Sequence, residues 1–138
     1  MNKLLVLLSL VVCGLLLGAA SADQDMNPNG SSELSLLMRK MEKQLVDARP
    51  EVLNDKYRGT YPAEFDKLKT AAPTDADTKT EYYNVFADLY TSSVKNLYAS
   101  KKYQVQAYNN VVNACLACHS QHCPGPVGRI RKLMIADQ

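Results

Sequence analysis

Five residues near the C-terminus have the types and the spacing of a covalent cofactor site. Residues 115–119 read Cys-Leu-Ala-Cys-His. In this pattern two thiols form thioether bonds to the vinyl groups of one haem, and the adjacent imidazole binds its iron. The spacing suits the chemistry, because both sulfur atoms must reach neighbouring edges of one porphyrin. The sequence therefore predicts one covalent haem c, with Cys115 and Cys118 as attachment points and His119 as the proximal iron ligand.

Two other kinds of chemistry use the same residue types. Structural Zn²⁺ binds cysteine and histidine, but it usually takes ligand pairs from two segments. Here all candidates come from one short segment, namely Cys115, Cys118, His119, His122 and Cys123. A thioredoxin-like thiol pair shares the C-x-x-C spacing, although that pair normally opens a helix within a βαβ unit. Haem attachment is favoured, and both alternatives stay open. Cys123 is expected to be a free thiol or a packed side chain, with intermolecular pairing as the alternative, and His122 is expected to be exposed.

The first 22 residues have the composition of a secretory signal peptide. Lys3 precedes a largely apolar run over residues 4–17, and small residues end at Ala22, which is the order of the charged, apolar and cleavage regions. Cleavage there leaves residues 23–138 as one domain and removes Cys13. The remaining three cysteines form a tight, odd-numbered group, which is not typical of a disulfide framework. We expect a periplasmic protein whose mature chain has no membrane span.

The overall charge excludes one class of partner. The 138 residues carry 16 Lys and Arg against 14 Asp and Glu, dispersed along the chain. Such a chain has no basic stripe for a phosphate backbone, so nucleic-acid binding is disfavoured. No carboxylate pair or Ser/His arrangement has a spacing typical of catalysis, so we do not expect an enzyme.

The first two helices are predicted from apolar periodicity and from proline. A helix capped by Ser31 or Ser32 runs to about Ala48, because Pro50 cannot continue it. A second, short helix starts at Pro62 and ends before residue 73. The apolar stripe of the first helix consists of Leu34, Leu37, Met38, Met41 and Leu45.

Two further helices lead into the motif. The third is expected to start at a capping box formed by Thr78 and Glu81, with Thr74 or Asp75 as alternative earlier starts, and to end near Ser100. Its apolar stripe is Tyr82, Val85, Phe86, Leu89, Ser93 and Leu97. The stripe of the fourth helix is Val105, Tyr108, Val111, Val112, Cys115 and His119, so the motif faces the core. Cys123 and the prolines after it end this helix, and residues 129–135 form a basic and apolar tail.

Four helices with short connections and no strand-like alternation predict an all-α fold. An antiparallel four-helix bundle with a covalently attached haem is the expected architecture, because bundles build cofactor sites from side chains of facing helices. A porphyrin between the helices adds apolar surface that so small a domain otherwise lacks.

Together these features resemble the four-helix-bundle c-type cytochromes of the cytochrome c′ and cytochrome c-556 type. The resemblance covers nearly the whole mature chain and rests mainly on the motif near the end of the last helix. It implies that the distal face of the haem meets the first helix. In the c-556 type a methionine of that helix binds iron, whereas in the c′ type an apolar residue leaves iron five-coordinate. Met38, followed by the basic Arg39, resembles the c-556 pattern and is the expected distal ligand; Met41, or an iron left open or blocked by Leu37, are the alternatives.

The resemblance implies an electron carrier with His119 and Met38 as axial ligands and with redox proteins as partners. Binding of NO or CO by five-coordinate iron is the alternative function. Arg129 and Arg131 are candidate partners of the haem propionates, because a guanidinium group matches a carboxylate. The arginine that the family commonly has early in its first helix is absent. The family often self-associates through a helix face, which is compatible with a homodimer.

Overall fold

The computed structural model describes residues 30–136, and all regular elements in this part of the chain are helical. Three α-helices are long: α2 (Glu33–Val52), α3 (Tyr83–Ala99) and α4 (Gln104–His122). Two 3-10 helices, η1 (Ala63–Lys69) and η2 (Ala76–Thr78), connect α2 to α3, and α5 (Val127–Arg131) follows α4. The predicted all-α class is confirmed for these residues. The predicted signal peptide, residues 1–22, lies outside them.

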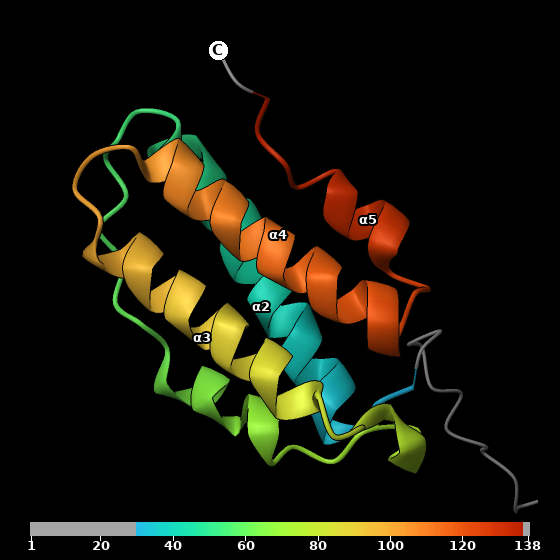
Figure 1. The fold of residues 1–138 in the computed structure, drawn as a ribbon. Helices are drawn as coiled ribbons and strands as arrows, with labels where there is room; N and C mark the ends of the chain where they lie inside the picture. The colour runs from blue at the N-terminus through green and yellow to red at the C-terminus, as the bar shows by residue number, and fades with distance from the viewer. Residues whose placement is uncertain (1–29, 137–138) are drawn as a thin grey trace, which may run out of the picture.

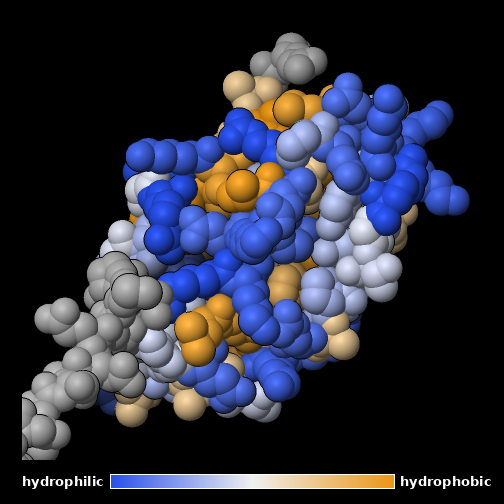
Figure 2. Space-filling view, turned by 180° about the vertical axis from the view of Figure 1, so that it is seen from behind, coloured by the Kyte–Doolittle hydropathy of each residue, from blue (hydrophilic) through white to orange (hydrophobic). Residues whose placement is uncertain are grey.

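The long helices lie side by side, and successive elements reverse direction. In Figure 1, α2 and α3 run towards one end of the molecule, while η1 and α4 run back. The short helix α5 lies beside α4, so the chain after the motif returns along the helix that carries it. The face that points away from the viewer in Figure 1 is shown in Figure 2 and is mainly hydrophilic, with smaller hydrophobic areas between its polar side chains. Within residues 30–136, no helix has both the length and the apolar character that a membrane crossing needs.

Helix α2 begins as predicted but ends later. The Ser32 hydroxyl accepts a hydrogen bond from the backbone N–H of Ser35 at 3.2 Å, which satisfies one free donor of the first turn. The predicted end near Ala48 is wrong, because α2 continues through Pro50 to Val52. Proline removes only one backbone donor this close to a helix end. Full burial of Val52 stabilises the extra turn.

The second predicted helix is the 3-10 helix η1, and its two buried side chains are Phe65 and Leu68. The capping box predicted at Thr78 and Glu81 does not start α3. Thr78 instead ends η2, in which the Asp75 carboxylate accepts a hydrogen bond from a backbone N–H at 3.0 Å. Short polar side chains satisfy backbone donors of turns as well as those of helices, and this competition misplaced the predicted start.

The buried face of α3 differs from the predicted stripe. Tyr82, Val85 and Leu89 are 62%, 64% and 47% exposed. The buried residues recur at steps of four and three and are Tyr83, Ala87, Tyr90, Val94 and Leu97. Tyrosine rings account for the difference, because each ring buries a large apolar area while its hydroxyl still finds a polar partner or a cavity.

Helix α4 ends at His122, directly before Cys123 and Pro124, as predicted. The sequence predicts a tail after it, but this segment packs against the rest of the domain. Ile130, Leu133 and Ile135 are buried in the common core. The Asn109 side chain holds the end of this segment, since it donates to the carbonyl of Ile135 at 2.8 Å and accepts from its N–H at 3.0 Å. The C-terminal segment therefore contributes side chains to the core of the domain.

Candidate functional site

The motif lines an apolar cavity between four helices. This first cavity has a volume of about 70 Å³ and takes its lining from α2, α3, α4 and α5. Cys115, Cys118 and His119 line it from α4, and Met38 lines it from α2. The structure thus brings together all four residues that the sequence assigned to the haem and its iron.

A second, larger cavity adjoins the first. It has a volume of about 350 Å³ and opens towards the N-terminal end of α2 and the turn after α4. The residues that line both cavities are Met38, Tyr83, Cys118, His119, Pro126 and Arg129. We call the two cavities together the cleft. The volume of the larger cavity falls within the range of roughly 300–1,000 Å³ typical of small-molecule and cofactor sites.

The two thiols of the motif are protected from ionisation. Cys115 and Cys118 lie one turn apart on α4, and the cysteines at 115, 118 and 123 are all free. Burial raises the pKa of Cys115 to about 12, and burial followed by the nearby Cys123 raises the pKa of Cys118 to about 11. A redox-active thiol pair works through a lowered thiol pKa. The environment of these two thiols is therefore the opposite of the one that the thiol-oxidoreductase alternative requires.

The His119 ring is held in one orientation by the chain that follows it. Its Nδ1 atom lies 2.9 Å from the carbonyl oxygen of Cys123. A carbonyl can only accept a hydrogen bond, so Nδ1 carries the proton and Nε2 has a free lone pair. Burial lowers the pKa of His119, which favours the neutral ring. A neutral imidazole whose other nitrogen donates to a carbonyl is the usual form of a metal-binding histidine.

Two methionines of α2 line the first cavity. Met38 is partly buried and lines both cavities, whereas Met41 is only 4% exposed and lines the first alone. Leu37 lines neither cavity and is buried in the core. The cleft therefore leaves Met38 and Met41 as candidate distal ligands, and Leu37 is not placed to block it.

Two arginines line the cleft, and one of them, Arg129, is a residue that the sequence suggested. Arg129 lines both cavities, and its Nε atom lies 3.0 Å from a carboxylate oxygen of Glu42. Arg131 is exposed on α5 and lines neither cavity, so the structure does not support it as a propionate partner. Arg39, which sequence analysis passed over as a cleft residue, lines the second cavity and donates two hydrogen bonds of 3.1 Å to the carbonyl of Gly30. The only sequence signal for Arg39 as a cleft residue is its position directly after Met38.

Two residues that line the cleft carry buried polar atoms without partners in the described part of the chain. The hydroxyl of Tyr90 and both ring nitrogens of His122 are buried without a hydrogen-bond partner among the described residues. Tyr90 lines the first cavity and His122 the second. The prediction that His122 is exposed is wrong, because its ring packs edge-on against Tyr83 and Phe86, with centroids 5.8 and 5.4 Å apart. Buried polar groups normally have partners, so Tyr90 and His122 are exceptions among the described residues.

The zinc alternative finds no support in the side-chain geometry. Across residues 30–136, no three side chains of His, Cys, Asp or Glu are grouped closely enough to hold a metal ion. The helix instead places Cys115, Cys118 and His119 along one face of α4, where all three line the first cavity.

Comparison with known proteins adds no relative. No protein-family model, no curated protein and no solved structure matches the chain. Its chemistry is therefore argued from its own residues.

Proposed function

We propose that this chain is an exported monohaem c-type cytochrome of the four-helix-bundle type that carries electrons in the periplasm. One observation carries the proposal: Cys115, Cys118 and His119 on α4 and Met38 on α2 line a single cleft. The reversing order of α2, η1, α3 and α4 supports the bundle architecture, because such bundles build cofactor sites from facing helices.

The residues of the cleft fit a covalently held haem. Cys115 and Cys118 would form its two thioether bonds, and the Nε2 atom of His119 would bind its iron from the α4 side. Met38 would occupy the opposite side from α2. Arg129 and Arg39 line the second cavity, so they are the candidate partners of the propionates. When bound, the haem supplies an iron that changes between ferrous and ferric states.

The protein contributes orientation, ligand choice and exclusion of water. The carbonyl of Cys123 keeps the proton on Nδ1 of His119, so the ring is fixed before any metal arrives. A thioether from Met38 favours the ferrous state and raises the reduction potential. The apolar lining from Tyr83, Phe86 and Leu133 keeps water from the site, which limits the solvent rearrangement that accompanies a change of charge.

Mass spectrometry tests the attachment directly. The protein is produced by export in cells that attach haem, and the peptide that spans residues 115–119 is weighed. We expect one added porphyrin mass on this peptide, and we expect that the double substitution Cys115→Ser and Cys118→Ser abolishes it. An unmodified peptide with two titratable thiols would overturn the proposal.

Spectroscopy then separates an electron carrier from a gas-binding protein. We expect low-spin iron in both redox states, converted to high-spin iron with rapid CO binding by Met38→Ala. The matched variant Met41→Ala removes the same side chain one turn away and should leave the spin state unchanged. A high-spin wild-type protein that binds CO rapidly would instead support the five-coordinate alternative.

A further inference from the structure

Helix α3 has apolar residues on two faces, and only one of these faces is in the core. On the outer face lie Tyr82, directly before the helix, and then Val85 and Leu89. Ser92 and Asn96, which are also exposed, continue this row along the helix. We call these five residues the outer stripe. None of them lines either cavity of the cleft.

The outer stripe has the spacing of a contact between two helices. Its members follow one another at steps of three, four, three and four residues. This alternation aligns side chains along one seam, which packs against an equivalent seam of another helix. Within residues 30–136 the seam stays uncovered, since its three large side chains are 62%, 64% and 47% exposed. Single exposed apolar residues are common, whereas an ordered row of them indicates a binding surface.

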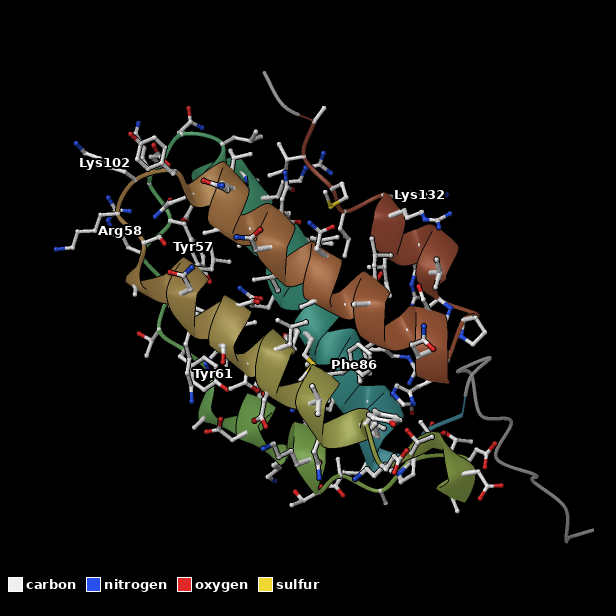
Figure 3. The ribbon with its side chains drawn as sticks, viewed as in Figure 1. Tyr57, Arg58, Tyr61, Phe86, Lys102 and Lys132 are labelled. Atoms are coloured by element: carbon white, nitrogen blue, oxygen red, sulfur yellow. The ribbon has the colours of Figure 1, made fainter. Side chains whose placement is uncertain are left out.

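The helix beside the outer stripe carries no charge. Helix α4 contains no Asp, Glu, Lys or Arg, and its exposed residues are Gln106, Asn110, Asn113, Ser120 and Gln121. In Figure 1, α3 and α4 lie side by side on the face towards the viewer, and Figure 3 shows Phe86 between them. This face can therefore meet a copy of itself without repulsion between like charges on its α4 side.

Charged residues border the outer stripe on its other flank, next to η1. Glu81, Asp88 and Lys95 follow one another at intervals of seven residues, so they lie in one row beside the stripe. Asp88 is paired with Lys69 of η1 at 2.6 Å, and the Lys95 ammonium lies 3.7 Å from Asp66. The row is therefore negative at one end, positive at the other, and balanced in the middle.

We propose that the outer stripe binds the outer stripe of a second copy of this chain, with the two α3 helices antiparallel. A two-fold axis beside Leu89 brings the two leucines together and reverses one row of charges against the other. Glu81 of each copy then lies opposite Lys95 of the other copy, which forms two pairs of opposite charge. A parallel arrangement would place the charged row against the flank of Phe86 and Ser93, which has no charge. Charge complementarity therefore selects the antiparallel pair.

The contact is small, so the association should be reversible. Helix α3 has 17 residues, which gives a seam about 25 Å long. Two helices that touch over this length bury less than the roughly 1,600 Å² of a standard interface, and Ser92 and Asn96 make part of the seam polar. We therefore expect a dimer that dissociates on dilution, with a dissociation constant in roughly the micromolar range.

Sedimentation equilibrium of the purified exported protein, over a roughly hundredfold range of concentration around this value, tests the proposal. We expect monomer at the lowest concentration and dimer at the highest. Leu89→Asp should weaken association by roughly a hundredfold or more, because two like charges then meet at the centre of the contact. Val46→Asp is the matched control, since Val46 lies on α2 and is 51% exposed, against 47% for Leu89. It should leave the dimer intact, and circular dichroism shows whether both variants keep the helix content of the wild type.

Charge reversal tests the antiparallel orientation. Glu81→Lys and Lys95→Glu should each weaken association roughly tenfold at low salt, because each variant brings two pairs of like charges together. An equimolar mixture of the two variants should restore it, since every lysine then meets a glutamate. The mixture contains the same two chains as the separate samples, so any local effect of Lys95→Glu on Asp66 is the same in both.

Three results would overturn the inference: a monomer at every concentration, equal weakening by Val46→Asp and Leu89→Asp, or a mixture that associates no more tightly than the separate variants. The inference does not depend on the proposed function. Haem attachment is decided by the mass of the peptide of residues 115–119, which none of these substitutions changes.

Discussion

Arg129 and Glu42 form an ion pair that joins α5 to α2, with 3.0 Å between Nε and a carboxylate oxygen. Both side chains line the first cavity. The pair therefore places one positive and one negative charge at the edge of the cleft, where either charge can influence the redox state of an iron.

Arg129→Ala is expected to lower the reduction potential of the haem-loaded protein. Loss of the cation removes a charge that opposes ferric iron and leaves the Glu42 carboxylate unbalanced, so the ferric state gains roughly 1 kcal/mol. The free energy of unfolding should change by less than about 1 kcal/mol, since Arg129 is 56% exposed and solvent screens the pair. Potentiometric titration measures the first effect and urea unfolding the second. Arg131→Ala, on the same short helix but outside the cleft, should leave the potential unchanged; an equal shift would show that the effect is not local.

Gln104→Ala is expected to destabilise the protein by roughly 2–4 kcal/mol, because it leaves buried backbone groups unpaired. The Gln104 side chain accepts from the N–H of Tyr57 at 2.9 Å and donates to the carbonyls of Tyr57 and Ser100 at 3.0 and 2.6 Å. It is fully buried and ties the loop after α2 to the start of α4. Chemical denaturation checks the effect. Gln106→Ala, an exposed change on the same helix, should cost less than about 0.5 kcal/mol.

Tyr83→Phe is expected to cost roughly 1–2 kcal/mol near neutral pH, because it leaves the carbonyl of Leu68 without the 2.9 Å bond from the tyrosine hydroxyl. Tyr82→Phe, one residue earlier and exposed, should cost almost nothing. Equal unfolding midpoints for the two variants would show that the bond between α3 and η1 contributes nothing.

The same variant has an expected pH dependence. Burial first, and the nearby Cys118 second, raise the pKa of Tyr83 from 10.0 to about 12. A raised pKa means that the folded state holds the proton more tightly, so this contribution to stability is complete below pH 10 and is lost as the pH rises to about 12. Tyr83→Phe should therefore lose less stability across this window than the wild type. Urea unfolding at several alkaline pH values measures the difference, and parallel losses would contradict the assignment.

Asn109→Ala is expected to release the end of the C-terminal segment. The side chain makes two hydrogen bonds to the backbone of Ile135, and alanine can form neither of them. Hydrogen exchange at the amide of Ile135 should become faster, while exchange in the middle of α4 stays slow. Asn110→Ala, the next residue and exposed, serves as the control and should leave the amide of Ile135 protected.

Much of the fold follows from local patterns. The cap at Ser32 and the end of α4 before Pro124 depend on residues close in sequence, and both are as predicted. The buried face of α3 could not be predicted in this way. Tyr83 faces the core because the carbonyl of Leu68, which comes from a different part of the chain, accepts a hydrogen bond from its hydroxyl. Tyr90 is buried by rings and helices that pack together only in the folded chain.

The sequence by itself determined the C-x-x-C-H motif at residues 115–119, on which the proposed haem attachment rests, and the helical character of the chain, because the motif and the caps depend on neighbours within one or two turns. Tertiary structure decided what faces the motif. Only the packing of α2, α3 and α5 against α4 brings Met38, Tyr90 and Arg129 to one cleft and leaves Leu37 and Arg131 outside it. The physical reason is that burial of a side chain depends on the combined surface of several helices, which no single helix encodes.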